Sequence, residues 1–136
     1  MIIMIILLRG GEIMRNRKKN LNIHYGDIWM CDLKKMSGSV QFGYRPVFIL
    51  SNNVNNMYAN TLNIIPLTTK TKRKLPVHVV LWDYQKYGLK AQSTMLIEQI
   101  MTIPISDLDY CIGNIENKDV LKSIADAIAV QFSIYQ

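Results

Sequence analysis

The sequence predicts a mainly β domain with a C-terminal helix, an α+β arrangement in which short strands form a small, closed or partly closed barrel. Three observations predict this class. Short runs rich in β-branched and aromatic residues recur along the chain, as is typical of strands. Segments rich in Gly, Pro, Asn and Lys separate these runs, and such residues favour turns and loops. Only the last segment has apolar residues at helical spacing.

Length and composition narrow the class of protein. The 136 residues correspond to one domain, and 49% hydrophobic with 19% charged residues excludes a disordered chain. Sixteen Lys and Arg against ten Asp and Glu give a net charge of +6, which suggests a polyanionic partner such as nucleic acid. The only cysteines, Cys31 and Cys111, form no framework, and we predict reduced, buried thiols in a cytoplasmic protein. We expect no structural zinc, since two histidines and two scattered cysteines do not make a zinc motif.

The first residues raise the question of where translation begins. Residues 1–8 are all apolar, but a transmembrane helix needs about 20 such residues, and no charged region or cleavage site marks a signal peptide. Residues 9–14, RGGEIM, can be encoded by a purine-rich string that contains a bacterial ribosome-binding site just before the codon of Met14. We therefore expect natural translation to start at Met14, with residues 1–13 a mis-annotated or disordered leader. The alternative is a hydrophobic anchor or strand.

A basic arm is expected over residues 14–24, ahead of a single domain at 25–136. Its basic residues lie in the run Arg15-Asn16-Arg17-Lys18-Lys19. Such a polar, aperiodic run is typical of a solvated tail, and it would also attract phosphates without sequence preference.

The strands follow in order. Gly26 and Asp27 form a turn, after which Trp29 and Cys31 alternate with their neighbours, so a strand is predicted at 28–33. Pro46 fits only a strand start or an edge. The remaining strands are expected at 47–50, 61–67, 77–81 and 93–97, with a continuation at 100–103 after an interruption at Glu98 and Gln99.

Loops and one helix complete the expected elements. Loops are predicted at 34–44, 51–60, 68–75 and 84–89. Asn117 is a suitable N-cap, with Asp119 in the first turn of the helix. The apolar face of this helix is predicted to hold Leu121, Ile124, Ala125, Ile128 and Phe132.

Several kinds of chemistry are excluded by their missing motifs. The sequence has no P-loop and no GxGxxG, HExxH or GxSxG, which argues against nucleotide phosphate transfer, zinc proteolysis and hydrolase-elbow chemistry. His24 and His78 form one candidate acid–base pair for RNA cleavage. The alternative is that one is exposed and the other is packed or paired within the sheet.

Arg45 and two threonines are the other candidates. Arg45 stands between a Gly-rich loop and Pro46, where stiff backbone would hold its guanidinium to grip a phosphate and stabilise developing charge. A surface ion pair is the alternative. Thr68 and Thr69 close a strand and open a basic loop; by themselves they are ordinary strand and turn residues.

Taken together, these pieces resemble the MazF/PemK family of bacterial toxins over residues 26–134. The order and spacing of the matching motifs carry the resemblance. They are Gly26-Asp27-Ile28-Trp29, Asp32-Leu33, Ser39-x-Gln41-x-Gly43-x-Arg45-Pro46-Val47, Leu50-Ser51-Asn52, Pro66-Leu67-Thr68, Leu75-Pro76-x-His78-Val79, Tyr87-Gly88-Leu89, Ser93 and Leu96-Ile97-Glu98-Gln99-Ile100-x-Thr102-Ile103.

The resemblance implies a small SH3-like β-barrel of the MazF/PemK/CcdB type that works as a cytoplasmic homodimer. It implies the toxin of a type II toxin–antitoxin system, a sequence-specific and metal-independent endoribonuclease acting on single-stranded RNA, mainly mRNA. In that reaction the 2′-OH attacks the adjacent phosphorus and leaves a 2′,3′-cyclic phosphate and a 5′-OH. The catalytic residues of the family fall on Arg45 and Thr68, and no cofactor is needed.

Other implied features concern binding. The RNA-binding residues would be Ser39, Gln41, Thr69, Lys70, Glu98 and Gln99. The implied partner is an antitoxin with an acidic, partly disordered tail, which would wrap the dimer and block the RNA groove.

Three positions depart from the family pattern. Tyr25 and Met101 stand where basic residues are usual, and Val40 stands where many members have Glu. Tyr25 would be able to stack on a base instead. These departures keep an alternative open: a non-catalytic relative that binds RNA or antitoxin, or a relative of the gyrase-poisoning branch of the same fold.

Overall fold

The computed structural model describes residues 22–70 and 75–134. The predicted leader and most of the basic arm therefore lie outside the described residues. The strands are β1 (Asp27–Leu33), β2 (Gly43–Ile49), β3 (Thr61–Thr68), β4 (His78–Leu81), β5 (Ser93–Leu96), β6 (Met101–Pro104) and β7 (Leu108–Asn114). The helices are α3 (Asn53–Tyr58), α4 (Lys118–Gln131) and three short 3₁₀ turns, η1 (Tyr84–Tyr87), η2 (Ile97–Gln99) and η3 (Ile105–Asp107).

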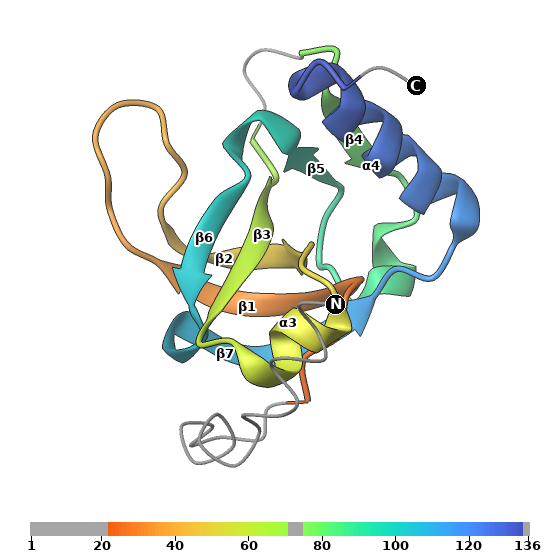
Figure 1. Cartoon of the computed structure of the whole chain (residues 1–136). Helices are drawn as coiled ribbons and strands as arrows, with labels where there is room; N and C mark the ends of the chain where they lie inside the picture. The colour runs from red at the N-terminus through yellow and green to blue at the C-terminus, as the bar shows by residue number, and fades with distance from the viewer. Residues whose placement is uncertain (1–21, 71–74, 135–136) are drawn as a thin grey trace.

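The strands form one antiparallel, seven-stranded sheet in the order β4-β5-β3-β2-β1-β7, and β6 pairs with β3 beside this path. The predicted class, mainly β with a C-terminal helix, is confirmed. In the described part of the chain the strand order has two ends, β4 and β7, so hydrogen bonding does not close it into a complete barrel. The 34–42 loop between β1 and β2 projects from the sheet, and α4 lies against β4 and η2 (Figure 1).

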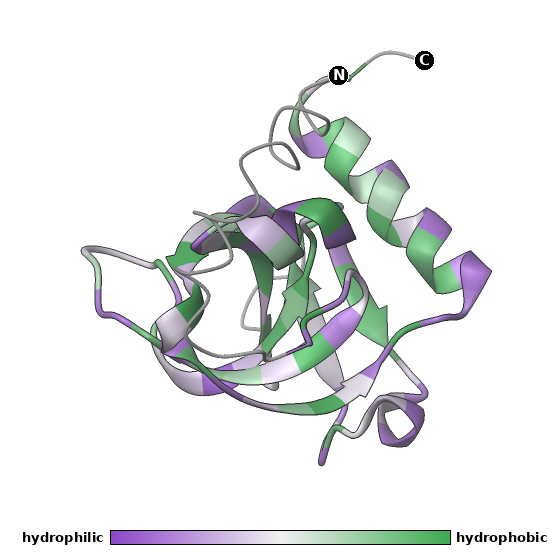
Figure 2. Ribbon diagram, turned by 60° about the horizontal axis from the view of Figure 1, so that its bottom comes forward, coloured by the Kyte–Doolittle hydropathy of each residue, from purple (hydrophilic) through white to green (hydrophobic). Residues whose placement is uncertain are grey.

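Two apolar clusters pack against the central strands. Ile65 and Leu67 of β3 belong to the first, together with Phe48 of β2, whereas Ile64 and Leu62 belong to the second. Successive side chains of a strand point to opposite faces, so these strands are covered on both sides. This explains the continuous apolar runs at Val47–Ile49 of β2 and Ile64–Leu67 of β3. Hydrophobic segments run through the strands in Figure 2 and alternate with hydrophilic ones along α4.

The predicted C-terminal helix is confirmed as α4. The Asn117 side chain accepts hydrogen bonds from the backbone N–H groups of Asp119 at 2.9 Å and Val120 at 3.1 Å, which is the expected N-cap. Ile124 is buried as predicted. The predicted apolar face is wrong at Ala125 and Phe132, which are exposed, because the helix turns Ala127 toward the core instead.

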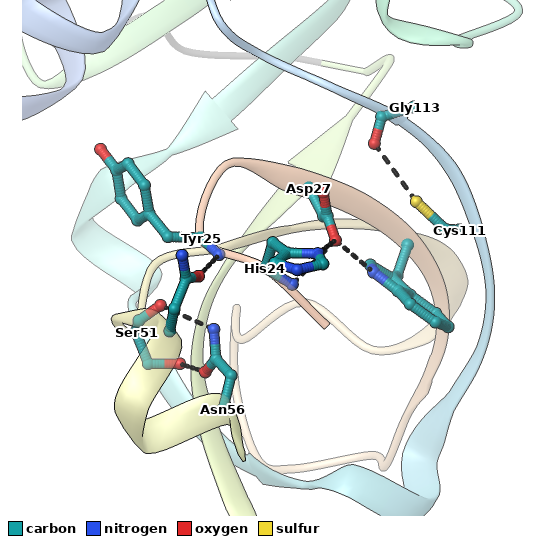
Figure 3. A network of polar contacts seen from close by, with 9 residues as sticks. His24, Tyr25, Asp27, Ser51, Asn56, Cys111 and Gly113 are labelled. Carbon is teal, nitrogen blue, oxygen red and sulfur yellow. Dashed lines mark hydrogen bonds and ion pairs between the residues drawn. The ribbon is translucent and has the colours of Figure 1, made fainter. Parts of the chain in front are cut away.

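The loop predicted at 51–60 instead contains the short helix α3. Asn52 caps it by accepting from the N–H of Asn55 at 2.8 Å. The Ser51 hydroxyl donates to Asn56 Oδ1 at 2.6 Å, and Asn56 Nδ2 donates back to the Ser51 carbonyl at 2.9 Å (Figure 3). Asparagine is unfavourable inside helices. The Asn52 cap and the buried Ser51–Asn56 pair therefore stabilise α3, and intrinsic helix propensity does not.

Strand β7 was not among the predicted elements. Its burial is irregular, and Asp109, Tyr110 and Cys111 are all exposed, so the alternation that marks a strand is absent. Pairing with β1, interrupted by register shifts, defines it. The prediction that Cys111 is buried is wrong for the same reason, whereas Cys31 is buried as expected.

Two glycines allow η1 to pack against β7. A Cβ on Gly88 would lie 1.9 Å from the Ile112 carbonyl oxygen, and one on Gly113 would lie 2.2 Å from that of Tyr87. Gly88 also has a φ of +79° at the end of η1, a region that favours glycine. The Tyr87-Gly88-Leu89 motif is therefore a close backbone contact.

Strand β2 begins at Gly43, four residues earlier than predicted. Pairing with β3 starts only at Val47, which lies opposite Pro66. Pro46 therefore lies in the part of β2 that is not paired with β3, where a missing N–H is tolerated. Among the described residues, no helix is long and apolar enough to cross a membrane.

Candidate active site

Arg45 is held at the inner end of the 34–42 loop by two backbone carbonyls. Its Nε donates to the carbonyl of Phe42 at 2.9 Å, and Nη1 donates to that of Leu67 at 3.3 Å. The side chain is half-buried, and this burial lowers the pKa of the guanidinium from its ordinary value. Arginine nonetheless stays charged in proteins. The result is a fixed cation whose other N–H donors bond nothing else among residues 22–70 and 75–134.

Thr68 ends β3 and is almost fully buried. Its hydroxyl accepts from the N–H of Lys70 at 3.1 Å and lies 3.3 Å from the Lys70 carbonyl. This local turn fixes the rotamer of Thr68 where the basic loop leaves the sheet. Thr69 and Lys70 follow it and are exposed.

The register of the sheet brings Arg45 and Thr68 together. Val47 lies opposite Pro66 in the antiparallel β2–β3 pair, so the same register carried two residues further sets Arg45 across from Thr68. At that point β3 is paired with β5 instead, with Thr68 opposite Thr94. Arg45 therefore bonds the peptide that immediately precedes Thr68. The two residues predicted to be catalytic lie at one site.

The 34–42 loop is attached to η2 by Gln99. The Gln99 Oε1 accepts from the N–H of Gln41 at 2.7 Å, and its Nε2 donates to the carbonyl of Ser39 at 3.2 Å. Three of the predicted RNA-binding residues are thus brought together. Both ends of the Gln99 amide are bound to the loop backbone, while the side chains of Ser39 and Gln41 are not used by these two bonds.

Glu98, the neighbour of Gln99, is paired with His78. The Nε2 of His78 lies 3.0 Å from Glu98 Oε2, and Nδ1 accepts from the N–H of Leu75 at 3.1 Å. The His78 side chain is only 3% exposed and that of Glu98 is 23% exposed. The family resemblance pointed to Glu98, but nothing in the sequence pointed to its pairing with His78. The spacing of the two residues along the chain, twenty positions apart, contains no signal for the contact.

The two histidines do not form a pair. His24 precedes β1, its side chain is 51% exposed, and its Nδ1 lies 3.8 Å from Asp27 Oδ2. His78 is in β4, which is separated from β1 in the sheet by β5, β3 and β2. The structure therefore favours the second alternative, in which one histidine is exposed and the other is packed and paired within the sheet.

The three departures from the family pattern have distinct surroundings. Tyr25 is exposed and packs edge-on against Phe48, with ring centroids 5.8 Å apart. Val40 is half-buried in the 34–42 loop. Met101 is half-buried and packs against the second apolar cluster. Within residues 22–70 and 75–134, no three His, Cys, Asp or Glu side chains are grouped so that they would hold a metal ion.

Comparison with known proteins gives consistent results. Residues 24–132 match the family model described as PemK-like, MazF-like toxin of type II toxin-antitoxin system. The chain is 31% identical over 110 residues to "Endoribonuclease EndoA" of Bacillus subtilis, covering 80% of this chain and 93% of that one. It is 32% identical over 111 residues to "Endoribonuclease MazF" of Staphylococcus saprophyticus, covering 81% and 91%.

A solved structure agrees in fold. The toxin MazF-mt6 of Mycobacterium tuberculosis superposes with a TM-score of 0.68 at 26% identity, covering 81% of this chain and 99% of that one. The family model spans most of the chain, and both curated relatives exceed 30% identity over nearly their full length. The chain belongs to the family of PemK-like, MazF-like toxins of type II toxin–antitoxin systems.

Proposed function

We propose that this toxin is a sequence-specific endoribonuclease that cleaves single-stranded RNA without a metal ion, with Arg45 and Thr68 as its catalytic residues. The observation that carries the proposal is the fixed guanidinium of Arg45, bonded to the peptide next to Thr68. Family membership and the two relatives named as endoribonucleases support the same activity.

The cleavage reaction needs stabilisation of the negative charge on the phosphate. It needs no nucleophile from the protein or from water, because the RNA supplies its own 2′-OH. The 2′-oxygen of the RNA forms a bond to the adjacent phosphorus as the bond from phosphorus to the 5′-oxygen breaks. The 2′-OH loses its proton and the 5′-oxygen gains one, so the products are a 2′,3′-cyclic phosphate and a 5′-OH. Arg45 donates hydrogen bonds to the negative charge that builds on the phosphate oxygens. The Thr68 hydroxyl holds a non-bridging oxygen.

The surrounding loops would bind the rest of the strand. Ser39 and Gln41 lie on the loop that Arg45 bonds through Phe42, and Thr69 and Lys70 are exposed immediately after Thr68. Single-stranded RNA fits such a site because its bases can be splayed out and its 2′-OH can align with the phosphorus. Glu98 and Gln99 contribute from η2, where Gln99 already holds the loop backbone.

The purified protein incubated with a mixed RNA pool in EDTA tests this function. Discrete fragments that carry 2′,3′-cyclic phosphate ends are expected, and Arg45→Ala should abolish them. Sequencing the fragment ends then identifies the recognised RNA word. An RNA pool left intact by the wild-type protein would contradict the proposal.

That negative outcome would favour a second candidate, a non-catalytic toxin that binds RNA or antitoxin. The observation behind it is Met101, which stands where the family usually has a basic residue and which packs against the second apolar cluster. Retention of RNA in a filter-binding assay without cleavage would identify this function.

The partners follow from the same family. A toxin of a type II toxin–antitoxin system is inhibited by an antitoxin, and the net charge of +6 suits an acidic, partly disordered antitoxin tail. We further propose that the toxin acts as a homodimer in the cytoplasm. Light scattering of the isolated toxin tests the homodimer, and co-purification of the tagged toxin with an antitoxin from its own cells tests the partner.

A further inference from the structure

His78 connects the chain just before β4 to η2. Its Nδ1 accepts from the N–H of Leu75, where the described chain resumes after the basic loop. An accepting Nδ1 carries no proton, so the ring proton lies on Nε2, which donates to Glu98 Oε2 at 3.0 Å. One buried imidazole therefore joins the start of β4 to η2.

A second set of contacts runs from η2 to Arg45. Gln99, next to Glu98, holds the backbone of Ser39 and Gln41 through both ends of its amide. One residue beyond Gln41, the carbonyl of Phe42 accepts from Arg45 Nε. Two hydrogen bonds thus attach the 34–42 loop to η2, and a carbonyl at the inner end of this loop accepts from the guanidinium.

We propose that His78 is a positioning residue of this site, which acts through Glu98 and η2 to hold the 34–42 loop and, with it, Arg45. The inference rests on the proposed ribonuclease function for its effect on activity, but its structural part stands without it. His78 does not need to touch RNA: its ring is 3% exposed.

The second carboxylate oxygen of Glu98 explains why the bond from His78 is needed to hold this side chain. Among the described residues, Glu98 Oε1 is buried without a hydrogen-bond partner, so within that part of the chain the carboxylate depends on the imidazole. A carboxylate with one buried oxygen pays a desolvation cost when it loses its donor. In a variant without this donor we expect Glu98 to turn toward water and η2 to shift with it.

Two substitutions separate the two bonds of His78. The amide oxygen of His78→Asn reaches the place of Nδ1 and keeps the Leu75 bond, but this variant loses the bond to Glu98. The amide nitrogen of His78→Gln reaches the place of Nε2 and keeps the bond to Glu98, but this variant loses the Leu75 bond. The proposal predicts a defect in His78→Asn that His78→Gln largely restores.

Hydrogen exchange of the Gln41 amide in the free protein is the first measurement. This N–H donates to Gln99, so its protection reports the attachment of the loop. We expect exchange about tenfold faster in His78→Asn, since a hydrogen bond to a charged group is worth at least that factor, and near wild type in His78→Gln. If His78→Asn does not fold, Glu98→Leu removes the same bond from the other side and should give the same result.

Cleavage is the second measurement, made on RNAs that carry the preferred word and a single-base variant of it. We expect kcat/KM of His78→Asn to fall by about tenfold on the preferred word and much less on the variant, because a loosened loop reads bases poorly. A purely structural role would lower both equally. Unchanged Gln41 exchange in His78→Asn, or equal acceleration in His78→Asn and His78→Gln, would overturn the proposal. Failure of the wild type to cut any RNA would overturn the ribonuclease function while the exchange data still decide the positioning role.

Discussion

The guanidinium of Arg45 donates to the main-chain carbonyl of Leu67 at 3.3 Å, so a side chain of β2 bonds the peptide that precedes Thr68 on β3. This contact forms where the β2–β3 ladder ends and β3 turns to pair with β5. Beyond Val47, β2 and β3 no longer pair, and the Arg45 guanidinium bonds the Leu67 carbonyl at this point.

The Thr68 hydroxyl should matter more than its burial suggests. Thr68→Val keeps the shape and the strand but loses Oγ1, and we expect cleavage to fall by about 10²-fold, as for the loss of one donor at a charged transition state. Thr68→Ser keeps the hydroxyl and should retain most activity. Thr61→Val, at the exposed opposite end of β3, is the matched control. A Thr68→Val enzyme as active as Thr61→Val would exclude Thr68 from catalysis.

Arg45→Lys tests geometry at constant charge. A lysine ammonium is a point charge that cannot contact the Phe42 and Leu67 carbonyls and also grip a phosphate with two donors. We expect kcat to fall by about 10²-fold, with little change in melting temperature. Initial rates on one defined oligonucleotide measure this. Activity within threefold of wild type would mean that charge alone suffices at this position.

The sequence predicts a strand well where its buried residues form an apolar run or a regular alternation. The apolar run of β3 is confirmed because both faces of that strand are covered. Strand β7 was missed because Asp109, Tyr110 and Cys111 are all exposed and its place depends on irregular pairing with β1. Helix α3 was missed because a buried Ser51–Asn56 pair overrides the poor helix propensity of asparagine.

In the candidate site, too, local features were predictable and long-range contacts were not. Arg45 and Thr68 were singled out because side-chain chemistry and motif spacing are visible in the sequence. The attachment of Gln99 to the backbone of Gln41 was not, because it joins positions 58 residues apart. The His78–Glu98 pair also depends on how η2 packs against β4. Such contacts arise from tertiary packing, and no local pattern encodes them.

The two cysteines should differ in reactivity. Burial, with the nearby carboxylates of Asp107 and Asp32, raises the pKa of Cys31 to about 12. Partial desolvation also raises the pKa of Cys111, although its side chain remains accessible to solvent. Because only the thiolate reacts, we expect iodoacetamide at pH 8 to modify Cys111 slowly and Cys31 only after unfolding. Peptide mass mapping checks this order, and faster labelling of Cys31 in the native protein would contradict it.

The contact between η1 and β7 should be intolerant of a single methyl group. Gly88→Ala places a Cβ 1.9 Å from the Ile112 carbonyl oxygen and imposes a positive φ on alanine, so we expect a loss of about 3 kcal/mol or more. Gly38→Ala has a comparable φ of +72° but no atom within 4 Å of the added Cβ. It should cost only about 1 kcal/mol. Urea unfolding measures both, and equal losses would show that the φ alone, without the close contact, sets the cost.

In the proposed reaction Arg45 and Thr68 promote attack of the RNA's own 2′-OH. An oligoribonucleotide that carries the recognised word, with one 2′-deoxy sugar immediately 5′ of the scissile phosphate, tests it most directly in EDTA. We expect the all-ribose strand to be cut to a 2′,3′-cyclic phosphate and the substituted strand to stay intact. Cleavage of the substituted strand at the same phosphate would show that the 2′-OH is not the nucleophile.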